Sequence, residues 1–263
     1  DWQMRRWRLL EALLMESPDI LCLQEVDHVH DFFRPELETA GYSGVFCGKP
    51  APAADGVFVL FRTGRFRLLQ TDVALDFVAL ALLEDLACSG RVLVVASAHF
   101  KSGKTAEAEG ERALQAREFL DRVVNFALSA GVSLSGPGAV PLLLAADLNA
   151  TPEADSKAGE PLAYRALLGD KLGLKSAYAG DGASGEPPYT TWKRRPKGEI
   201  KRTIDFIFHS TSVELVALLG LPSEGEMPPE RLPTHCYPSD HFALAADFRF
   251  RGGDESTHSD GHK

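Results

Sequence analysis

One short stretch of sequence, residues 141–155 (PLLLAADLNATPEAD), constrains the fold of this chain more than any other. Its apolar residues 142–145 predict a buried strand, and Pro152 prevents the strand from continuing past Asp147 and Asn149. A carboxylate and a carboxamide two residues apart therefore lie on the same side of a strand end. Such a pair can hold a metal ion or an attacking water where a sheet opens to solvent. The same pair can also form an Asx-turn with no catalytic role, so its meaning depends on the other strand ends.

Length and composition limit the class of protein. The chain has 263 residues, of which 44% are hydrophobic, and we expect one soluble domain with a core large enough to bury a site. No run of residues reaches the roughly 18 apolar positions of a membrane span, so we expect no membrane partner. Four cysteines without a CxxC pair indicate free thiols in a reducing compartment. We expect a cytoplasmic monomer, and a mitochondrial presequence upstream stays open.

Hydrophobic periodicity predicts that helices and strands alternate along the chain. The predicted helices cover residues 2–15, 31–40, 106–130 and 162–168. The predicted strands, besides the one that ends at Asp147, cover residues 20–23, 42–47, 57–61, 66–73, 78–83, 92–98, 203–209, 213–219 and 242–250.

Two regions without predicted helices allow predictions about pairing. The strands between residues 57 and 98 leave no room for helices, so we expect a meander of antiparallel hairpins there. We expect residues 185–202 to form a loop. Residues 213–219 are expected to pair with the strand 203–209.

Five strand ends or their flanking loops carry side chains suited to catalysis. They are Glu25, His99, Asp147 with Asn149, Asp205, and Asp240 with His241. Catalytic residues on sheet scaffolds collect where strands stop, whereas unselected polar residues would be scattered along the elements. Asp205 lies inside an apolar strand, and burying a carboxylate without a partner costs several kcal/mol. We therefore expect a partner for Asp205, and His241 is the best candidate.

The residues at these positions resemble the endonuclease/exonuclease/phosphatase superfamily. The motifs LCLQEVD, SAHFKSG, LLLAADLNATP, RTIDFIF and YPSDHFAL are similar to its five successive motifs and stand in the same order. QEVD, EPPYTTW and RLPTHCYPSDH are similar to the deadenylase branch of that superfamily. The resemblance extends over residues 2–250 and implies an α/β fold, a four-layer α/β sandwich of two mixed β-sheets flanked by helices. It also implies Mg²⁺-dependent hydrolysis of a phosphate ester, with Mn²⁺ as an alternative ion.

The resemblance implies roles for the acidic residues. Mg²⁺ prefers oxygen ligands and keeps several waters, so one or two carboxylates suffice, and Glu25 is the expected ligand. Asp240 would add a ligand at a second metal position. Asp147 would orient or deprotonate the attacking water, and Asn149 would hold that water or a phosphate oxygen. We expect the Asp147 carboxylate to be partly solvated.

The resemblance also implies roles for basic groups. His241, with its ring fixed by Asp205, would contact the phosphoryl group or act as a base. His99 and Lys101 would offset the charge that develops on the phosphoryl oxygens. Taken one at a time, Glu25 could equally pair with a surface cation, and His99 could be a satisfied core histidine. Their shared position at strand ends favours the catalytic interpretation.

Aromatic and basic residues near position 190 bear on the substrate. Tyr189 and Trp192 could stack on a base, or both could pack within their loop. Arg194 and Arg195 belong to the basic run KRRPKGEIKR, which suits a phosphate-rich small substrate or a short strand but is also typical of a solvated hairpin. A formal net charge of −9 argues against long duplex DNA, because nonspecific phosphate binding needs a broad basic face.

The sequence is compatible with three functions. Within the resemblance, one type of branch member removes the 2′-phosphate from NADP(H), and sister enzymes remove 3′ adenylates from single-stranded poly(A) RNA. Lysines near the site favour the compact dinucleotide, because its extra phosphate needs compensating charge. A catalytically weak nucleotide- or RNA-binding module is the alternative of another class.

The resemblance is incomplete at the amino terminus. The family pattern begins with a strand whose Trp-Asn pair supplies an asparagine near the metal, and residue 1 lies after that point. We expect the sequence to be a piece of a longer protein that contains this strand, because a sheet without it would expose an edge. We expect residues 1–250 to form one catalytic domain and the polar tail 251–263 to be disordered.

Overall fold

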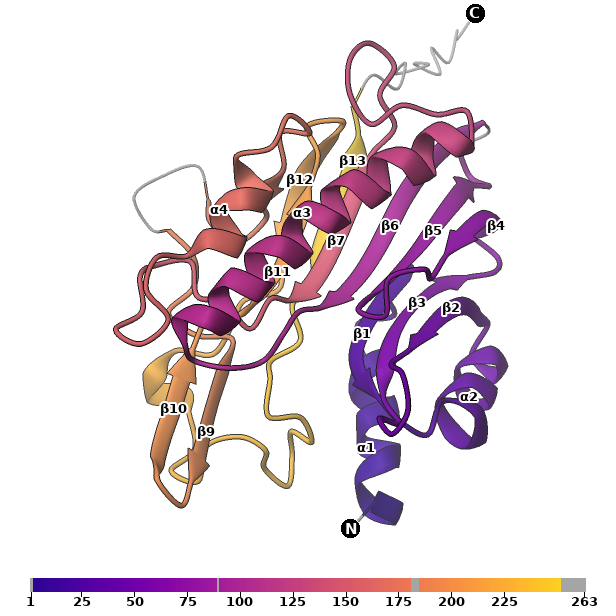
Figure 1. Cartoon of the computed structure of the whole chain (residues 1–263). Helices are drawn as coiled ribbons and strands as arrows, with labels where there is room; N and C mark the ends of the chain where they lie inside the picture. Colours follow the sequence, from indigo (N-terminus) through magenta and orange to yellow (C-terminus); the bar gives the residue numbers. More distant parts are fainter. Residues whose placement is uncertain (1, 89, 181–184, 252–263) are drawn as a thin grey trace, which may run out of the picture.

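Two β-sheets packed face to face form the centre of the computed structural model (Figure 1). The structure describes residues 2–88, 90–180 and 185–251. The tail predicted to be disordered, residues 251–263, lies outside the described residues except for Arg251.

The larger sheet has six strands in the order β4-β5-β6-β7-β11-β8, in which β6 and β7 are parallel. Its strands are β4 (Phe66–Asp72), β5 (Val78–Asp85), β6 (Arg91–His99), β7 (Leu142–Asp147), β8 (Lys175–Ser176) and β11 (Asp205–His209). The smaller sheet has the order β1-β3-β2 and antiparallel pairs, with β1 (Ile20–Val26), β2 (Tyr42–Gly48) and β3 (Gly56–Arg62). Two separate hairpins pair β9 (Thr191–Arg195) with β10 (Gly198–Arg202), and β12 (Val213–Leu218) with β13 (Ala246–Phe250).

Helices cover the outer face of each sheet. The helical segments are α1 (Trp2–Leu14), a π-helical turn (Val29–Phe33), α2 (Arg34–Thr39), α3 (Ala106–Ser129), α4 (Leu162–Leu168) and a 3₁₀ turn (Glu224–Glu226). α3 and α4 pack on the larger sheet around buried side chains such as Phe119 and Phe206, and α1 and α2 pack on the smaller sheet around Phe58. Val59 and Val95 belong to the core between the two sheets. The predicted four-layer α/β sandwich is therefore confirmed.

Local signals set the helix boundaries close to the predicted positions. The side chain of Thr105 accepts a hydrogen bond of 3.2 Å from the N–H of Ala108 and so caps the start of α3. Gly131, with φ of +74°, follows its end. The helix predicted over residues 31–40 begins as the π-helical turn, and α2 follows with Pro35 in its first turn.

Three predictions about strands are wrong, because each depends on which distant segment a strand meets. β3 is not part of a meander with β4–β6, since it is the buried central strand of the smaller sheet. Residues 213–219 do form a strand, but β12 pairs with β13, while β11 pairs with β7 and β8. Residues 185–202, predicted as a loop, contain the β9–β10 hairpin.

All four cysteines are free thiols, as predicted. Burial raises the pKa of the Cys47 thiol, which keeps it protonated and unreactive. No helix among the described residues is long and apolar enough to cross a membrane.

A buried ion pair joins α3 to the loop that follows His99. Arg112 is fully buried, and its Nε donates to Glu109 Oε2 at 2.8 Å. Its Nη1 donates to the backbone oxygens of Lys101 and Gly103 at 3.0 and 2.9 Å. The other oxygen of Glu109 accepts from the N–H of Ala163 at 3.0 Å, at the start of α4. This pair therefore fixes the loop after β6 relative to both helices.

We predict that Arg112→Met lowers the free energy of unfolding by roughly 3–5 kcal/mol, because it leaves the Glu109 carboxylate buried without its cation. Urea unfolding followed by circular dichroism measures this change. The double variant Arg112→Met with Glu109→Gln should lose less, since no buried charge remains. A single variant within about 1 kcal/mol of the wild type would show that the pair is not needed for stability.

Candidate active site

Strand register places three titratable side chains in one row across the larger sheet. His99 at the end of β6 lies opposite Asp147 on the parallel strand β7, and Asp205 on β11 lies opposite the same Asp147. Directly opposite residues on neighbouring strands point to the same face of a sheet. The row lies where β6 and β7 end, at the end of the molecule that carries the β9–β10 hairpin (Figure 1).

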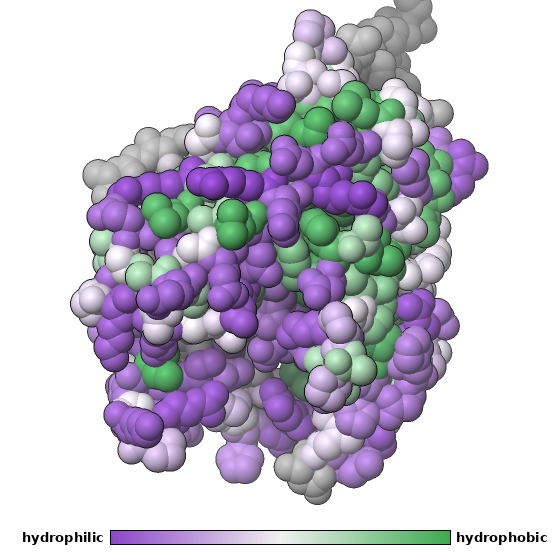
Figure 2. Space-filling view, in the orientation of Figure 1, coloured by the Kyte–Doolittle hydropathy of each residue, from purple (hydrophilic) through white to green (hydrophobic). Residues whose placement is uncertain are grey.

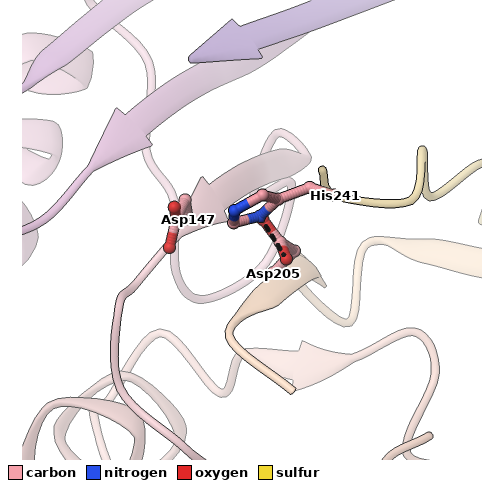
Figure 3. Close-up of side chains that lie close together, drawn as sticks. All are labelled: Asp147, Asp205 and His241. Atoms are coloured by element: carbon pink, nitrogen blue, oxygen red, sulfur yellow. Dashed lines mark hydrogen bonds and ion pairs between the residues drawn. The ribbon is translucent and has the colours of Figure 1, made fainter. Parts of the chain in front are cut away.

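His241 comes to this row from the loop before β13. Its Nδ1 lies 3.0 Å from each carboxylate oxygen of Asp205, and the Thr190 hydroxyl donates to the same carboxylate. One ligand atom from each of Asp147, Asp205 and His241 lies within 4.8 Å of the other two (Figure 3). Asp205 thus has His241 as the partner that its position demands, and the imidazole is held in a fixed orientation beside Asp147.

His99 connects this group to Asn149 and Glu25. Its Nε2 lies 3.1 Å from Nδ2 of Asn149. Carboxylate oxygens of Glu25 and Asp147 lie 3.7 and 3.8 Å from the same nitrogen. Because an amide nitrogen only donates, Nε2 accepts and the ring is neutral. Burial, and then the charge of Lys49, lower the pKa of His99, in agreement with a neutral imidazole.

Asp147 and Asn149 form an Asx-turn, which the sequence had offered as an alternative to a catalytic role. Both residues nevertheless lie beside His99, so the turn is part of the site. The N–H of Asn149 donates to Asp147 Oδ1 at 2.7 Å, and Asn149 has φ of +52°. Its side-chain amide donates to the backbone oxygen of Phe100 at 3.1 Å. One oxygen of Asp147 therefore closes the turn, while the other faces His99.

Glu25 occupies an irregular position in β1. The register between β1 and β3 shifts between Leu23 and Val26, and Glu25 has φ of +53°. Its side chain is 70% exposed, in contrast to the buried Asp147. Two carboxylates, one exposed and one buried, therefore approach the same His99 imidazole. Oxygen donors placed in this way suit a hard divalent cation.

Burial changes the proton affinities of the two central groups. Asp147 is only 6% exposed, so the expectation of a partly solvated carboxylate is wrong. Burial, and then the charge of Asp205, raise the pKa of Asp147 from 3.8 to about 7. Burial alone would lower the pKa of His241, but the hydrogen bond and charge of Asp205 outweigh it and raise that pKa to about 9. At neutral pH His241 is therefore a cation and Asp147 is close to its titration point.

Asp240 is already neutralised by protein cations. Its Oδ2 lies 2.6 Å from Nζ of Lys193 and 3.0 Å from Nη2 of Arg195. Burial would raise the pKa of Asp240, but the hydrogen bond from Lys193 outweighs it and the pKa is lowered. The expected role of Asp240 as a second metal ligand stays a prediction, and a metal ion there would have to displace Lys193 and Arg195. Asp240 instead anchors β9 to the loop that carries His241.

Tyr189 and Trp192 are packed inside the protein. They are 1% and 7% exposed and share a small core with Leu232. The Trp192 Nε1 donates to Glu199 at 2.8 Å, and the Arg231 guanidinium lies 4.0 Å from the ring centre. The expectation that these rings stack on a base is therefore corrected by the structure, which shows the alternative of packing within their segment.

The other three residues predicted to bind substrate are exposed cations. Lys101 follows the end of β6, and its side chain is 53% exposed. Arg195 pairs with Asp240 and so lies beside the site. Arg194 pairs instead with Glu199 on the opposite strand of the hairpin, at 2.9 Å. The structure brings Arg195 to the site, leaves Arg194 on the hairpin, and pairs the Lys101 side chain with Glu111 on α3 at 3.7 Å.

Sequence reasoning missed Lys49, which lies near His99 and lowers its pKa. Lys49 follows β2 and pairs with Asp55, just before β3. It lines a cavity of about 290 Å³ together with side chains that include His28, His30 and Phe46. No local pattern marks this lysine, because its place beside the site comes from the packing of the two sheets. Figure 2 shows mostly hydrophilic side chains at the lower end of the molecule, with a hollow between its two sides.

Comparison with known proteins identifies the family. The model of the Endonuclease/Exonuclease/phosphatase family matches residues 1–241. The chain belongs to this family. Nocturnin from Xenopus laevis is 37% identical over 270 residues, which cover 95% of this chain and 65% of that protein. The solved structure of the human Nocturnin catalytic domain with bound sulfate anion is 30% identical with a TM-score of 0.74, and the match covers 95% of this chain and 87% of that chain.

A second, less similar relative is named as a 3'-5'-exoribonuclease. The CCR4-Not complex 3'-5'-exoribonuclease subunit Ccr4 of Neosartorya fischeri is 26% identical, and the match covers 96% of this chain and 44% of that protein. The predicted superfamily and its deadenylase branch are therefore confirmed, with Nocturnin more similar to this chain than Ccr4. The chain spans less than two thirds of the length of these two curated relatives.

We predict that Asp147→Asn stabilises the metal-free protein more at about pH 8 than at about pH 5. The folded-state pKa of Asp147 lies above the unfolded value of 3.8, so the wild type loses stability as pH rises towards about 7. Asparagine carries no charge and escapes that loss. Melting temperatures of both proteins in EDTA measure the effect, and a difference between them that does not change with pH would contradict it.

We predict that Trp192→Ala lowers the free energy of unfolding by about 3 kcal/mol, because a buried aromatic ring is removed from a small core. Thermal unfolding measures this, and Trp192→Phe should lose much less. KM for an adenine-containing substrate should stay unchanged for the folded fraction. A stable Trp192→Ala variant with a raised KM would return Trp192 to a base-stacking role.

Proposed function

We propose that this chain is a divalent-metal-dependent phosphoesterase that hydrolyses a phosphate ester next to adenosine. The observation that carries the proposal is the row of His99, Asp147 and Asp205 with His241 against it. It joins carboxylates with a protonated imidazole, the two kinds of group that in-line hydrolysis of a phosphate ester requires.

We infer that Mg²⁺ is the ion that this site uses. Glu25 and Asp147 offer carboxylate oxygens near one imidazole nitrogen, and the raised pKa of Asp147 shows that nearby positive charge does not fully compensate its carboxylate. An oxygen-rich donor set with one solvent-exposed member fits an ion that keeps several of its waters. When bound, the ion would polarise a phosphoryl oxygen and offset its charge.

Two cationic donors mark the position of the phosphoryl group. Nε2 of His241 lies 3.3 Å from Nζ of Lys193. With His241 protonated, these two donors repel each other unless an acceptor lies between them. A phosphoryl oxygen that accepts from both would relieve this repulsion and gain two charge-assisted hydrogen bonds. Arg195, which shares Asp240 with Lys193, adds a third positive charge nearby.

Proton transfer then falls to Asp147. In the metal-free site, burial and the charge of Asp205 raise the pKa of Asp147 from 3.8 to about 7, so this carboxylate is the strongest candidate to accept a proton from an attacking water. Asn149, whose amide is held by its bonds to His99 and Phe100, would hold that water or a phosphoryl oxygen. His99 is neutral because its pKa is lowered. Its role is therefore to orient the Asn149 amide rather than to supply a charge.

For the substrate we infer the 2′-phosphate of NADP(H). The greater similarity to Nocturnin than to the Ccr4 exoribonuclease supports this choice. The packed Trp192 supports it too, because an RNA strand held by base stacking needs an exposed ring. The human Nocturnin catalytic domain was solved with a bound sulfate, an anion of similar shape to phosphate. Short poly(A) RNA is the second candidate, favoured by the exposed basic hairpin with Arg194.

We predict Mg²⁺-dependent phosphate release from NADPH that stops in EDTA and leaves an oligoadenylate intact. Phosphate release and the length of a labelled oligoadenylate are measured side by side. Asp147→Asn should reduce turnover by at least about a hundredfold, as expected for loss of a general base. Its melting temperature serves as the control for folding.

The other outcomes separate the alternatives. Stepwise shortening of the oligoadenylate without phosphate release would make the chain a 3′ exoribonuclease. Inactivity on both substrates, in a folded protein with Mg²⁺, would contradict the proposal and favour a binding module. Full activity of Asp147→Asn would contradict the assigned base.

A further inference from the structure

The hydroxyl of Thr190 is buried, and all of its hydrogen-bonding positions are used. Thr190 is 0% exposed, and its hydroxyl oxygen accepts from the backbone N–H groups of Ile204 and Asp205 at 3.0 and 3.1 Å. A hydroxyl has two acceptor positions and one proton, so these two bonds leave only the proton to be donated. That proton goes to Oδ2 of Asp205. The backbone therefore sets the direction of the bond between Thr190 and the Asp205 carboxylate.

The backbone of Thr190 is fixed as well as its side chain. Its N–H donates to the backbone oxygen of Arg202 at 2.9 Å, at the base of the β9–β10 hairpin, and its own oxygen accepts from the N–H of Phe242 at 2.7 Å. Phe242 directly follows His241. Thr190 thus holds both partners of the Asp205–His241 pair, the first through its side chain and the second through its backbone (Figure 3 shows the pair).

The Asp205 carboxylate needs a fixed donor of this kind. Nδ1 of His241 lies 3.0 Å from each of its two oxygens, so the imidazole alone does not select one rotation of the carboxylate. The terminal torsion of an aspartate side chain is broad and is not fixed by its rotamer preference. A hydroxyl that donates to Oδ2 alone selects one plane for the carboxylate. The plane of the His241 ring, which bonds to that carboxylate, is then set too.

We propose that Thr190 is a positioning residue for the hydrolysis, which acts through Asp205 on the His241 imidazole and does not touch the substrate. The proposal rests on the proposed function, in which His241 donates to a phosphoryl oxygen. A donor stabilises charge that develops in the transition state only when it is already aimed at that charge. An Asp205 carboxylate that turns freely would leave the His241 ring free to turn as well.

Replacements of Thr190 test this role by kinetics on NADPH. Thr190→Val keeps the shape without the hydroxyl and should lower kcat by about tenfold to a hundredfold, the loss found when the partner that orients a metal-binding histidine is removed. KM should stay within about twofold, because the buried hydroxyl does not reach the substrate. Thr190→Ser keeps the hydroxyl and should keep the wild-type kcat. Thr190→Cys, with a weak donor and acceptor, should fall between Thr190→Ser and Thr190→Val.

Thr203→Val is the matched control for loss of a buried threonine hydroxyl. Thr203 is 6% exposed and lies close to Asp205 in the chain, but its hydroxyl donates to the backbone oxygen of Pro187. This variant should lose stability in thermal unfolding, as Thr190→Val does, and should keep the wild-type kcat. Equal losses of kcat in the two valine variants would overturn the proposal, because the effect would then follow from lower stability. A loss in Thr190→Val confined to KM would overturn it too.

A double-mutant cycle shows whether Thr190 acts through Asp205. In the Asp205→Ala background the carboxylate that Thr190 orients is absent, so Thr190→Val should reduce kcat no further. A further loss of kcat as large as in the wild-type background would overturn the assigned route.

NMR of the metal-free whole chain tests the geometry without turnover. The Nδ1–H of His241 should give a downfield proton resonance that is absent from His241→Asn. Thr190→Val should broaden this resonance, because a carboxylate that turns freely lets the proton exchange with water, whereas Thr190→Ser and Thr203→Val should keep it. An unchanged resonance in Thr190→Val would overturn the proposal. If the wild type releases no phosphate from NADPH while the resonance still depends on Thr190, the proposed substrate fails and the positioning role stands.

Discussion

The central constraint on this structure is that the buried Asp147 lies directly opposite the partly buried Asp205 on the adjacent strand. Like charges opposite each other destabilise a sheet, and burial adds the cost of desolvation. The structure offsets this cost with the His241 imidazole and the Thr190 hydroxyl on Asp205, and by a raised pKa of Asp147. Both partners come from outside the sheet. The late loops must therefore close over the end of β7 and β11 before these carboxylates can be buried.

Most carboxylates and cations of the site come from different parts of the fold, apart from Asp240, which pairs with Lys193 and Arg195. Carboxylates lie on the sheet side, where β1, β7 and β11 carry Glu25, Asp147 and Asp205. Cations lie on the hairpin side, where Lys193 and Arg195 on β9 accompany His241. A substrate that brings a phosphate and is hydrolysed with the help of a metal ion fits between these two halves. The sheet thus supplies the carboxylates that act in hydrolysis, and the hairpin supplies the cations that bind phosphate. The sequence of the hairpin can therefore vary without loss of the catalytic row.

The loop after His99 is held in place by hydrogen bonds from two sides. Arg112 holds its backbone from α3, and the amide of Asn149 holds Phe100 from the other side. Lys101 on this loop therefore has a fixed backbone, and its exposed side chain pairs with Glu111 at 3.7 Å. The buried pair of Arg112 with Glu109 stabilises the position of this loop more than it stabilises any single element.

The sequence by itself determined the elements and the kinds of chemistry available. The hydrophobic periodicity marks α3, and the run before Asp147 marks β7, because these signals arise within a few neighbouring residues. The need for a partner at Asp205 was also visible, since an acid inside an apolar strand must be compensated. Candidate catalytic residues could be named in this way because they stand at strand ends or in the loops beside them.

Only the tertiary structure decided which of these residues meet. The row of His99, Asp147 and Asp205 follows from the register of three strands, and register is set by contacts between segments far apart in the chain. For the same reason the sequence could not show that β3 joins the smaller sheet, that Asp240 pairs with Lys193, or that Trp192 is buried. The local sequence pattern specifies the element in which a residue lies and the chemistry of its side chain. Packing between distant segments decides which other side chains it contacts.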